Sequence, residues 1–110
     1  MEERNKYYQV TINGIAFEWD TWKDQRTIHI HGVSFREAAE IFANDDTLFV
    51  PDEEHSDLDE ERWNAIGYSF KQRILIVCHC YRDGERIRII TARKAEPSEI
   101  AEYEAERRKI

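Results

Sequence analysis

The chain has 110 residues, of which 41% are hydrophobic, 12% aromatic and 35% charged, and its formal net charge at pH 7 is −7. This composition predicts a single folded domain over residues 1–110, large enough to bury a core, and excludes a disordered chain. No apolar run approaches the roughly 20 residues of a membrane span, and the N-terminus lacks the apolar segment of a signal peptide. We therefore expect a cytoplasmic protein without membrane contact.

The chain opens with a predicted β-hairpin. Residues 7–19 are rich in β-branched and aromatic side chains, which favour strands. Asn13-Gly14 at their centre is a dipeptide that favours a type I′ turn. Residues 1–16 are accordingly interpreted as an N-terminal strand extension of the domain.

Two helices are predicted next. Asp20 can cap a helix that ends at Gly32, although β-branched residues near its end weaken this prediction. Ser34 can cap the second helix, and Glu37 three positions later completes the pattern of a capping box. The second helix carries an apolar stripe formed by Ala38, Ala39, Ile41 and Phe42.

A short strand ending at Pro51 leads into the most acidic part of the chain. Residues 52–61 contain seven Asp or Glu and no Lys or Arg. This segment is predicted to be a loop, and two interpretations of it remain open. It is either a solvated connection or an acidic flap that shields, or competes at, a basic surface of the fold.

Three strands are predicted after this loop, over residues 62–70, 73–82 and 86–95. A turn is expected at residues 71–72 and another at Asp83-Gly84, which is a second hairpin dipeptide. The last strand alternates arginine with isoleucine over residues 86–89, so one of its faces is basic and the other apolar.

The chain closes with a predicted helix over residues 96–110. Pro97 suits its first turn, and the acids of this segment precede its bases, as the helix dipole favours. The predicted fold class is α+β: an antiparallel meander sheet with two N-terminal helices and a C-terminal helix, all packed on one face of the sheet.

The two cysteines, Cys78 and Cys80, share one face of a predicted strand, whereas His79 points to the opposite face. A closed zinc site needs about four ligands, and only two lie on the same side here. We expect two ordinary thiols, and neither a metal nor a cofactor.

Charge is distributed unevenly along the chain. Residues 62–94 carry eight Lys or Arg and only two acids, although the whole chain is acidic. Arginines concentrated on one sheet suit an anion, and phosphate is the commonest candidate because a guanidinium group binds it bidentately. The alternative is that these are ordinary outward-facing strand residues paired with acids elsewhere.

A series of short motifs covers residues 17–103. These are Phe17-Glu18-Trp19-Asp20, Lys23, His31-Gly32-Val33-Ser34-Phe35, Glu37-Ala38, His55-Ser56, Glu61-Arg62-Trp63, Ile66-Gly67, Arg73, Arg82, Arg88-Ile89-Ile90-Thr91-Ala92-Arg93-Lys94-Ala95, Glu99 and Tyr103. In this order and spacing the chain resembles the BrnT toxins, the ribonuclease partners in BrnT/BrnA type II toxin–antitoxin pairs.

The resemblance implies a bacterial protein with a RelE-like fold that cleaves RNA and thereby inhibits translation and growth. It also implies a BrnA-like antitoxin of ribbon-helix-helix type, through which the complex would contact DNA only indirectly. Three positions depart from the family's pattern: Ile30 replaces a usual Lys, Thr27 a usual Asn, and Thr21 a frequent Pro. The loss of a Lys next to His31 would weaken catalysis rather than the fold.

A metal-independent ribonuclease must deprotonate a 2′-hydroxyl, stabilise a phosphorane-like transition state and protonate the leaving 5′-oxygen. We predict Arg62, Arg82 and Arg93, from three strands, as phosphate-binding or transition-state-stabilising residues. His31 is the first candidate for acid–base catalysis. The predicted substrate-binding residues are Lys23, Arg73 and Arg88.

Several of these roles have alternatives. His31 could instead hydrogen-bond the end of the first helix, and Arg93 could form an ion pair with Glu18 or Asp20. His55, in the acidic loop, ranks below His31 as a site residue. The alternative to a toxin ribonuclease is a catalytically weak or inactive antitoxin-binding module that acts in autoregulation of its operon.

Overall fold

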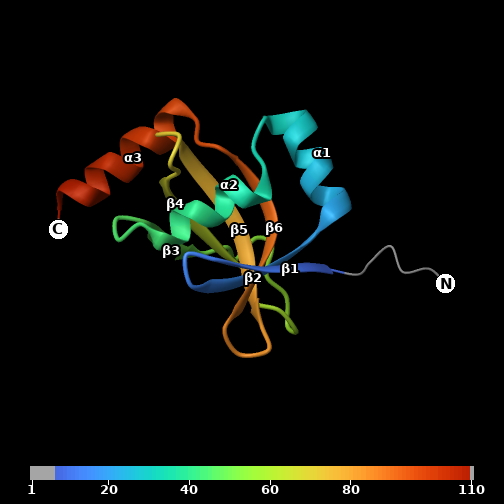
Figure 1. The fold of residues 1–110 in the computed structure, drawn as a ribbon. Coiled ribbons are helices and arrows are strands. Elements are labelled where there is room, and N and C mark those ends of the chain that lie inside the picture. Colours follow the sequence, from blue (N-terminus) through green and yellow to red (C-terminus); the bar gives the residue numbers. More distant parts are fainter. Residues whose placement is uncertain (1–6, 110) are drawn as a thin grey trace.

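The structure is a computed structural model and describes residues 7–109. Within this range six strands form one sheet in the order β1-β2-β6-β5-β4-β3, accompanied by three α-helices and a short 3-10 helix (Figure 1). In chain order the elements are β1 (Tyr7–Ile12), β2 (Ile15–Asp20), α1 (Thr21–His31), α2 (Phe35–Glu40), η1 (Ile41–Ala43), β3 (Leu48–Pro51), β4 (Trp63–Tyr68), β5 (Ile74–Arg82), β6 (Arg86–Lys94) and α3 (Pro97–Arg108). The predicted strand extension at residues 1–6 and the predicted helix end at Ile110 lie outside the described residues.

The first hairpin is confirmed. Asn13 and Gly14 have φ angles of 54° and 80°, which is the left-handed backbone that a type I′ turn requires at both central positions. Ile12 and Ile15 therefore face each other directly across the turn, and β1 and β2 pair antiparallel along their whole length.

Both ends of α1 are confirmed. The Asp20 carboxylate accepts hydrogen bonds from the backbone N–H groups of Trp22 and Lys23, at 2.8 and 3.4 Å. Gly32 ends the helix with a φ of 70°, and its N–H donates to the carbonyl of Ile28. The cap and the glycine thus outweigh the β-branched residues near the end of the helix.

The start of α2 is only half as predicted. Ser34 Oγ accepts the backbone N–H of Glu37 at 2.9 Å, which confirms the N-cap. The Glu37 side chain does not complete the capping box, because it turns inward and is 3% exposed. There it accepts hydrogen bonds from the hydroxyl of Ser69, at 2.7 Å, and from the guanidinium of Arg73. Glu37 thus forms a buried ion pair with Arg73 instead of the backbone hydrogen bond of a capping box.

The predicted fold class was wrong on two points. The sheet is mixed rather than antiparallel, because β2 lies parallel to β6, with Phe17 opposite Ile87 and Glu18 opposite Arg88. The antiparallel meander is confirmed for β3, β4, β5 and β6. The hairpin, however, pairs through β2 with the free edge of β6, which is distant from it in the sequence. The fold class also named two N-terminal helices, whereas α1 and α2 follow the β1–β2 hairpin, as the predicted order of elements along the chain had it.

The helices cover both faces of the sheet. Phe35 from α2 packs with Ala65 and Leu75 in the main core, on one face. Successive strand residues point to opposite faces, so Asn64 and Ile66 lie on the other. Tyr103 of α3 meets that second face, and the prediction that all helices pack on one face was therefore wrong. We call the second face, opposite α2, the open face.

A bulge in β6 decides which side chains reach the open face. The register between β5 and β6 shifts at Cys78 and His79. Ile89 and Ile90 lie on opposite faces, as alternation requires, and Ile90 packs with the cysteines on the open face. After the shift, Ala92 lies in the main core beside Ile89. The alternation predicted for β6 holds as far as Ile89. Beyond the bulge, Arg93 is brought to the open face.

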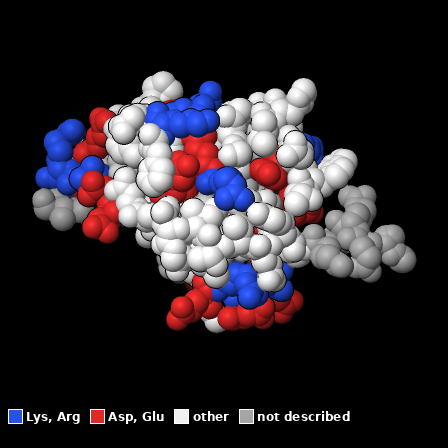
Figure 2. Space-filling model, viewed as in Figure 1, with Lys and Arg blue, Asp and Glu red and all other residues white. Residues whose placement is uncertain are grey.

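The charged side chains of the strands are largely paired. On the face drawn in Figure 2, Lys and Arg occur in separate groups beside Asp and Glu, not as one continuous basic patch. Near the turn between β5 and β6, for example, Arg86 lies 2.9 Å from Asp83 and 3.8 Å from Glu18. Among residues 7–109, no helix is long and apolar enough to cross a membrane.

Candidate functional site

Two adjoining hollows form a groove along the open face of the sheet. The larger, of about 260 Å³, lies between the loop of residues 52–61 and strands β4, β5 and β6. The smaller, of about 80 Å³, lies between β1, β6 and the first turn of α1. Arg62 and Ile90 line both hollows, so the two hollows lie next to each other. We call the two hollows together the arginine groove.

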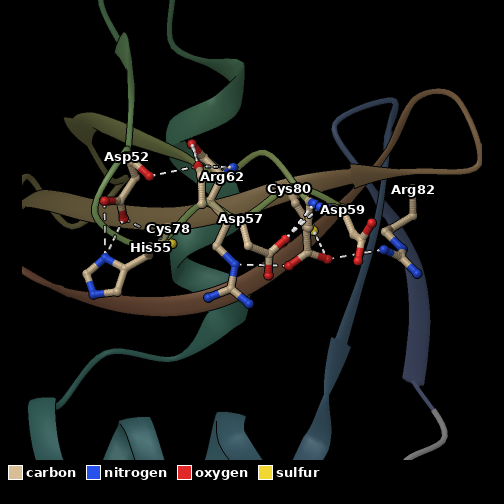
Figure 3. Close-up of polar contacts among 10 residues, drawn as sticks. Asp52, His55, Asp57, Asp59, Arg62, Cys78, Cys80 and Arg82 are labelled. Atoms are coloured by element: carbon tan, nitrogen blue, oxygen red, sulfur yellow. Dashed lines mark hydrogen bonds and ion pairs between the residues drawn. The ribbon is translucent and has the colours of Figure 1, made fainter.

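The acidic loop lies along the arginines of this groove (Figure 3). Glu60 accepts hydrogen bonds from Arg62 Nε at 2.9 Å, from Arg82 Nη1 at 3.1 Å and from Cys80 Sγ at 3.4 Å. Burial alone would raise the pKa of Glu60, but the hydrogen bond from Arg62 and the nearby cations lower it overall. Glu60 thus pairs with two arginines, as expected of an acidic flap, whereas most other residues of the loop are exposed, as expected of a solvated connection.

Arg93 is fixed by the first turn of α3. Its Nη1 and Nη2 atoms donate to the two carboxylate oxygens of Glu99, at 2.9 and 2.8 Å. This bidentate pair, with the backbone N–H of Glu96, lowers the pKa of Glu99 to about 2. An ion pair of Arg93 was among the predicted alternatives, but the predicted partners Glu18 and Asp20 were wrong. The Arg93 side chain remains 41% exposed and lines the larger hollow.

His55 and Asp52 form a hydrogen-bonded pair in the larger hollow. His55 Nδ1 lies 2.9 and 3.1 Å from the two carboxylate oxygens of Asp52, and Cys78 Sγ donates to the same carboxylate at 3.6 Å. Asp52 is 9% exposed, whereas the His55 side chain is 58% exposed. Burial would raise the pKa of Asp52, but the hydrogen bond from His55 lowers it overall. With Nδ1 on the carboxylate, His55 Nε2 is the nitrogen that can exchange a proton in the groove.

The structure places His55, which the sequence interpretation ranked below His31, in the same hollow as Arg62 and Arg93. It lies in a loop without periodicity, so no pattern predicted that it would meet Arg62 and Arg93 across the open face. The spacing of Asp52 and His55, three residues apart in front of Arg62, is the signal that could have found it.

Two of the predicted substrate-binding residues reach the groove. Lys23 and Arg88 line the smaller hollow. Arg82 pairs with Glu60 but lines neither hollow, and 41% of its side chain is exposed. It lies at the right-hand end of the residues labelled in Figure 3. With Arg62 and Arg93 in the larger hollow, most of the predicted cations are brought together on the open face.

Two predicted residues lie elsewhere. His31 is exposed at the end of α1 and lines neither hollow. Arg73 is bound to Glu37, and its Nη2 donates to the carbonyl of Gly32 at 3.0 Å. Arg73 thus fastens α2 and the end of α1 to the sheet, on the face opposite the groove.

The departures from the family's pattern do not touch the groove. Ile30 is 57% exposed on α1, and neither Ile30 nor Thr27 lines a hollow. The expected loss of a phosphate contact beside His31 therefore leaves the lining of the groove intact.

The two cysteines are protonated thiols at the floor of the open face. Cys78 and Cys80 are 7% and 1% exposed. Burial, followed by the nearby carboxylates Asp52 and Glu60, raises the pKa of each thiol to about 11. Over residues 7–109, no three His, Cys, Asp or Glu side chains cluster in a way that could hold a metal ion.

Comparison with known proteins gives the class of this molecule. Residues 19–99 match the family described as ribonuclease toxins, BrnT, of type II toxin–antitoxin systems. A toxin of this class acts on RNA and has an antitoxin as its partner. The chain belongs to the BrnT family, and the match spans α1, α2 and strands β3 to β6. No curated protein sequence matches the chain.

Proposed function

We propose that the arginine groove cleaves single-stranded RNA by a metal-independent reaction. The observation that carries this proposal is that His55, held by Asp52, lines the same hollow as Arg62 and Arg93. A base, an orienting carboxylate and two phosphate-binding groups are thereby combined in one space of about 260 Å³.

In this reaction, His55 Nε2 takes the proton of a ribose 2′-hydroxyl. The 2′-oxygen then attacks the neighbouring phosphorus, and the bond to the 5′-oxygen breaks. The 5′-oxygen leaves as a hydroxyl after gaining a proton from water. The products are a 2′,3′-cyclic phosphate and a 5′-hydroxyl end, and His55 returns its proton to solvent. Asp52 stabilises the imidazolium that forms, because its carboxylate accepts from Nδ1.

The arginines bind the phosphate and the charge that develops on it. Arg93 is preorganised by Glu99 and Arg62 by Glu60, so each guanidinium is held in place before RNA arrives. Arg82 would bind a phosphate of the RNA in place of the Glu60 carboxylate with which it pairs in the free protein. Lys23 and Arg88 would contact the adjoining backbone. His31 and Arg73 have no part in this scheme.

We further propose that the neutralising partner is a BrnA-like antitoxin of ribbon-helix-helix type, and that contact with DNA is made by the antitoxin alone. This rests on the family to which the chain belongs.

The test is cleavage of a labelled RNA in EDTA by the wild type, Arg62→Ala and Arg26→Ala. Loss of one preorganised donor typically lowers the rate about 10²- to 10³-fold, and we expect this for Arg62→Ala. Arg26 is exposed on α1 and lines neither hollow, so Arg26→Ala should cleave like the wild type. Equal loss in both variants would show a general charge effect and contradict the proposed role of the groove.

A second candidate function has one observation in its favour. Arg62, Arg82 and Arg93 each already have a carboxylate partner. A groove neutralised in this way also suits a catalytically weak or inactive module that binds the antitoxin and acts in operon autoregulation. Folded wild type that cleaves no RNA, with or without ribosomes, but forms a complex with the antitoxin would support this candidate.

A further inference from the structure

We propose that the smaller hollow of the arginine groove is a second phosphate-binding subsite, which holds the RNA phosphate next to the one that is cleaved. This inference rests on the proposed function, because it takes the larger hollow as the place of the scissile phosphate. It adds a defined footprint of two consecutive phosphates and a role for a residue of β1.

The lining of this hollow suits a phosphate group. Three cations, Lys23, Arg62 and Arg88, line a space of about 80 Å³. Three cations around one hollow suit a phosphate group, because a guanidinium binds phosphate oxygens bidentately and a lysine ammonium adds a point charge. Because Arg62 also lines the larger hollow, a strand that binds there continues directly into the smaller one.

Two carboxylates also line the hollow, but both are already engaged. Asp20 accepts the first N–H groups of α1, at 2.8 and 3.4 Å, and so acts as the helix cap. Glu60 is bound to Arg62 and Arg82 in the acidic flap. When phosphate displaces Glu60, the cations of both hollows become available together.

Arg88 is held for this task from two sides. Its Nε donates to Glu18 at 2.7 Å, and Glu18 is 3% exposed. Its guanidinium carbon lies 3.8 Å from the centre of the Tyr7 ring. A guanidinium stacked on an aromatic ring and tied at one edge loses little freedom on binding an anion, which favours affinity.

One residue of this subsite, Tyr7, lies outside the part of the chain that matches the family. It lies in β1, outside the matched residues 19–99, and it also lines the smaller hollow. The hairpin that adds β1 to the edge of the sheet therefore supplies one wall of the subsite.

The experiment compares non-cleavable 2′-O-methyl dinucleotides of uridine that carry one or two phosphates. The ligands are UpU and its forms with a further phosphate at the 5′ end (pUpU) or at the 3′ end (UpUp), and the dissociation constants are measured by NMR titration at low salt. One of the two doubly phosphorylated ligands should bind the wild type about tenfold more tightly than UpU, the effect of one charge-assisted hydrogen bond.

Four variants assign this gain to the hollow. Lys23→Ala and Tyr7→Ala should lose most of it. Tyr7→Phe should keep the gain, because stacking needs only the ring. Lys71→Ala should also keep it, since Lys71 is an exposed lysine that lines neither hollow.

The outcomes separate this inference from the proposed function. RNA cleavage by a wild type that shows no gain from either extra phosphate would overturn the subsite alone. A gain that persists in both Lys23→Ala and Tyr7→Ala would also overturn it. The expected gain in a wild type that does not cleave RNA would support the subsite and contradict the catalytic proposal. Failure of all three ligands to bind would contradict both.

Discussion

Glu60 is the residue that most directly controls the charge of the arginine groove. Its carboxylate is shared by Arg62 and Arg82, and its pKa is lowered, so it is ionised at neutral pH. In the proposed reaction, RNA would have to replace this carboxylate before its phosphates reach the same guanidinium groups. The acidic flap would then compete with substrate, as a bound anion would.

We predict that Glu60→Gln strengthens RNA binding. A partly exposed ion pair contributes up to about 1 kcal/mol, so removal of the competing charge should lower the dissociation constant by up to about fivefold. The measurement is fluorescence anisotropy with a non-cleavable RNA. Asp59→Asn is the matched control, because it removes the same charge from an exposed residue of the same loop. Binding by Glu60→Gln no tighter than by Asp59→Asn would contradict the competition.

His79 is a second residue whose surroundings determine a measurable property. It is fully buried, its Nδ1 lies 3.1 Å from the carbonyl oxygen of Val77, and its Nε2 has no hydrogen-bond partner among the described residues. The rings of Phe42, Phe49 and Tyr81 meet it edge-on. Burial lowers the pKa of His79, so the folded protein holds it neutral.

We predict that the protein loses stability as the pH falls below about 6.5, the usual pKa of an unfolded-state histidine. Below this pH the unfolded chain binds a proton at His79 and the folded chain does not, so unfolding is favoured. A single proton limits this contribution to about 1.4 kcal/mol per pH unit. Urea unfolding at pH 7 and pH 5 measures it, with His79→Phe as the comparison. An equal loss of stability in both proteins would show that His79 is not the group responsible.

At the scale of elements, β4 depends on one glycine. A Cβ atom at Gly67 would collide with the side chain and backbone of Thr47, which is 8% exposed. The hydroxyl of Thr47 in turn donates to the carbonyl of Ile41 at 2.6 Å, so it cannot move aside without losing a buried hydrogen bond. The segment between η1 and β3 is thus packed directly onto the backbone of β4.

We predict that Gly67→Ala destabilises the protein by about 1–3 kcal/mol, the usual effect of overpacking a buried site. The measurement is the free energy of unfolding in urea. The loss caused by Gly67→Ala should be smaller in a Thr47→Ala background than in the wild type, because alanine lacks the hydroxyl oxygen that the added Cβ would strike. A single variant as stable as the wild type would contradict the packing described here.

The elements show what could be predicted from the sequence and why. Asn13-Gly14, Asp20 and Gly32 act through their own backbone geometry, so hairpin and helix ends followed from local rules. The parallel pairing of β2 with β6 joins residues about 70 positions apart, such as Glu18 and Arg88, and no local signal determines it.

The site was predictable to a similar degree. Arg62, Arg88 and Arg93 were found because the concentration of charge on the predicted strands is visible in the sequence. The position of the Asp52–His55 pair depends on how the loop folds over the sheet. A loop has no periodic sequence pattern from which this could be predicted. Arg73 has the same charge as the groove arginines, but the partner that it meets, Glu37, had been assigned to a helix cap.

For the whole molecule, acidic character and RNA cleavage are compatible only if binding is local. The net charge of −7 repels a polyanion, and the surface drawn in Figure 2 has no continuous basic patch. Cations gather on the open face, where Glu60 of the acidic flap pairs with Arg62 and Glu99 of α3 positions Arg93. In the proposed reaction, RNA would replace the carboxylate of Glu60. The molecule should therefore bind short single-stranded segments that enter the groove rather than long stretches of nucleic acid.

The central claim is that His55, and not His31, performs proton transfer in a metal-independent cleavage of RNA. The most direct measurement is the single-turnover rate for a labelled RNA in EDTA, with the wild type, His55→Ala and His31→Ala, and with analysis of the product ends. We predict 2′,3′-cyclic phosphate products, a rate lowered about 10²- to 10⁴-fold in His55→Ala, and a rate close to the wild type in His31→Ala. Normal cleavage by His55→Ala, or a loss confined to His31→Ala, would contradict this account of the groove.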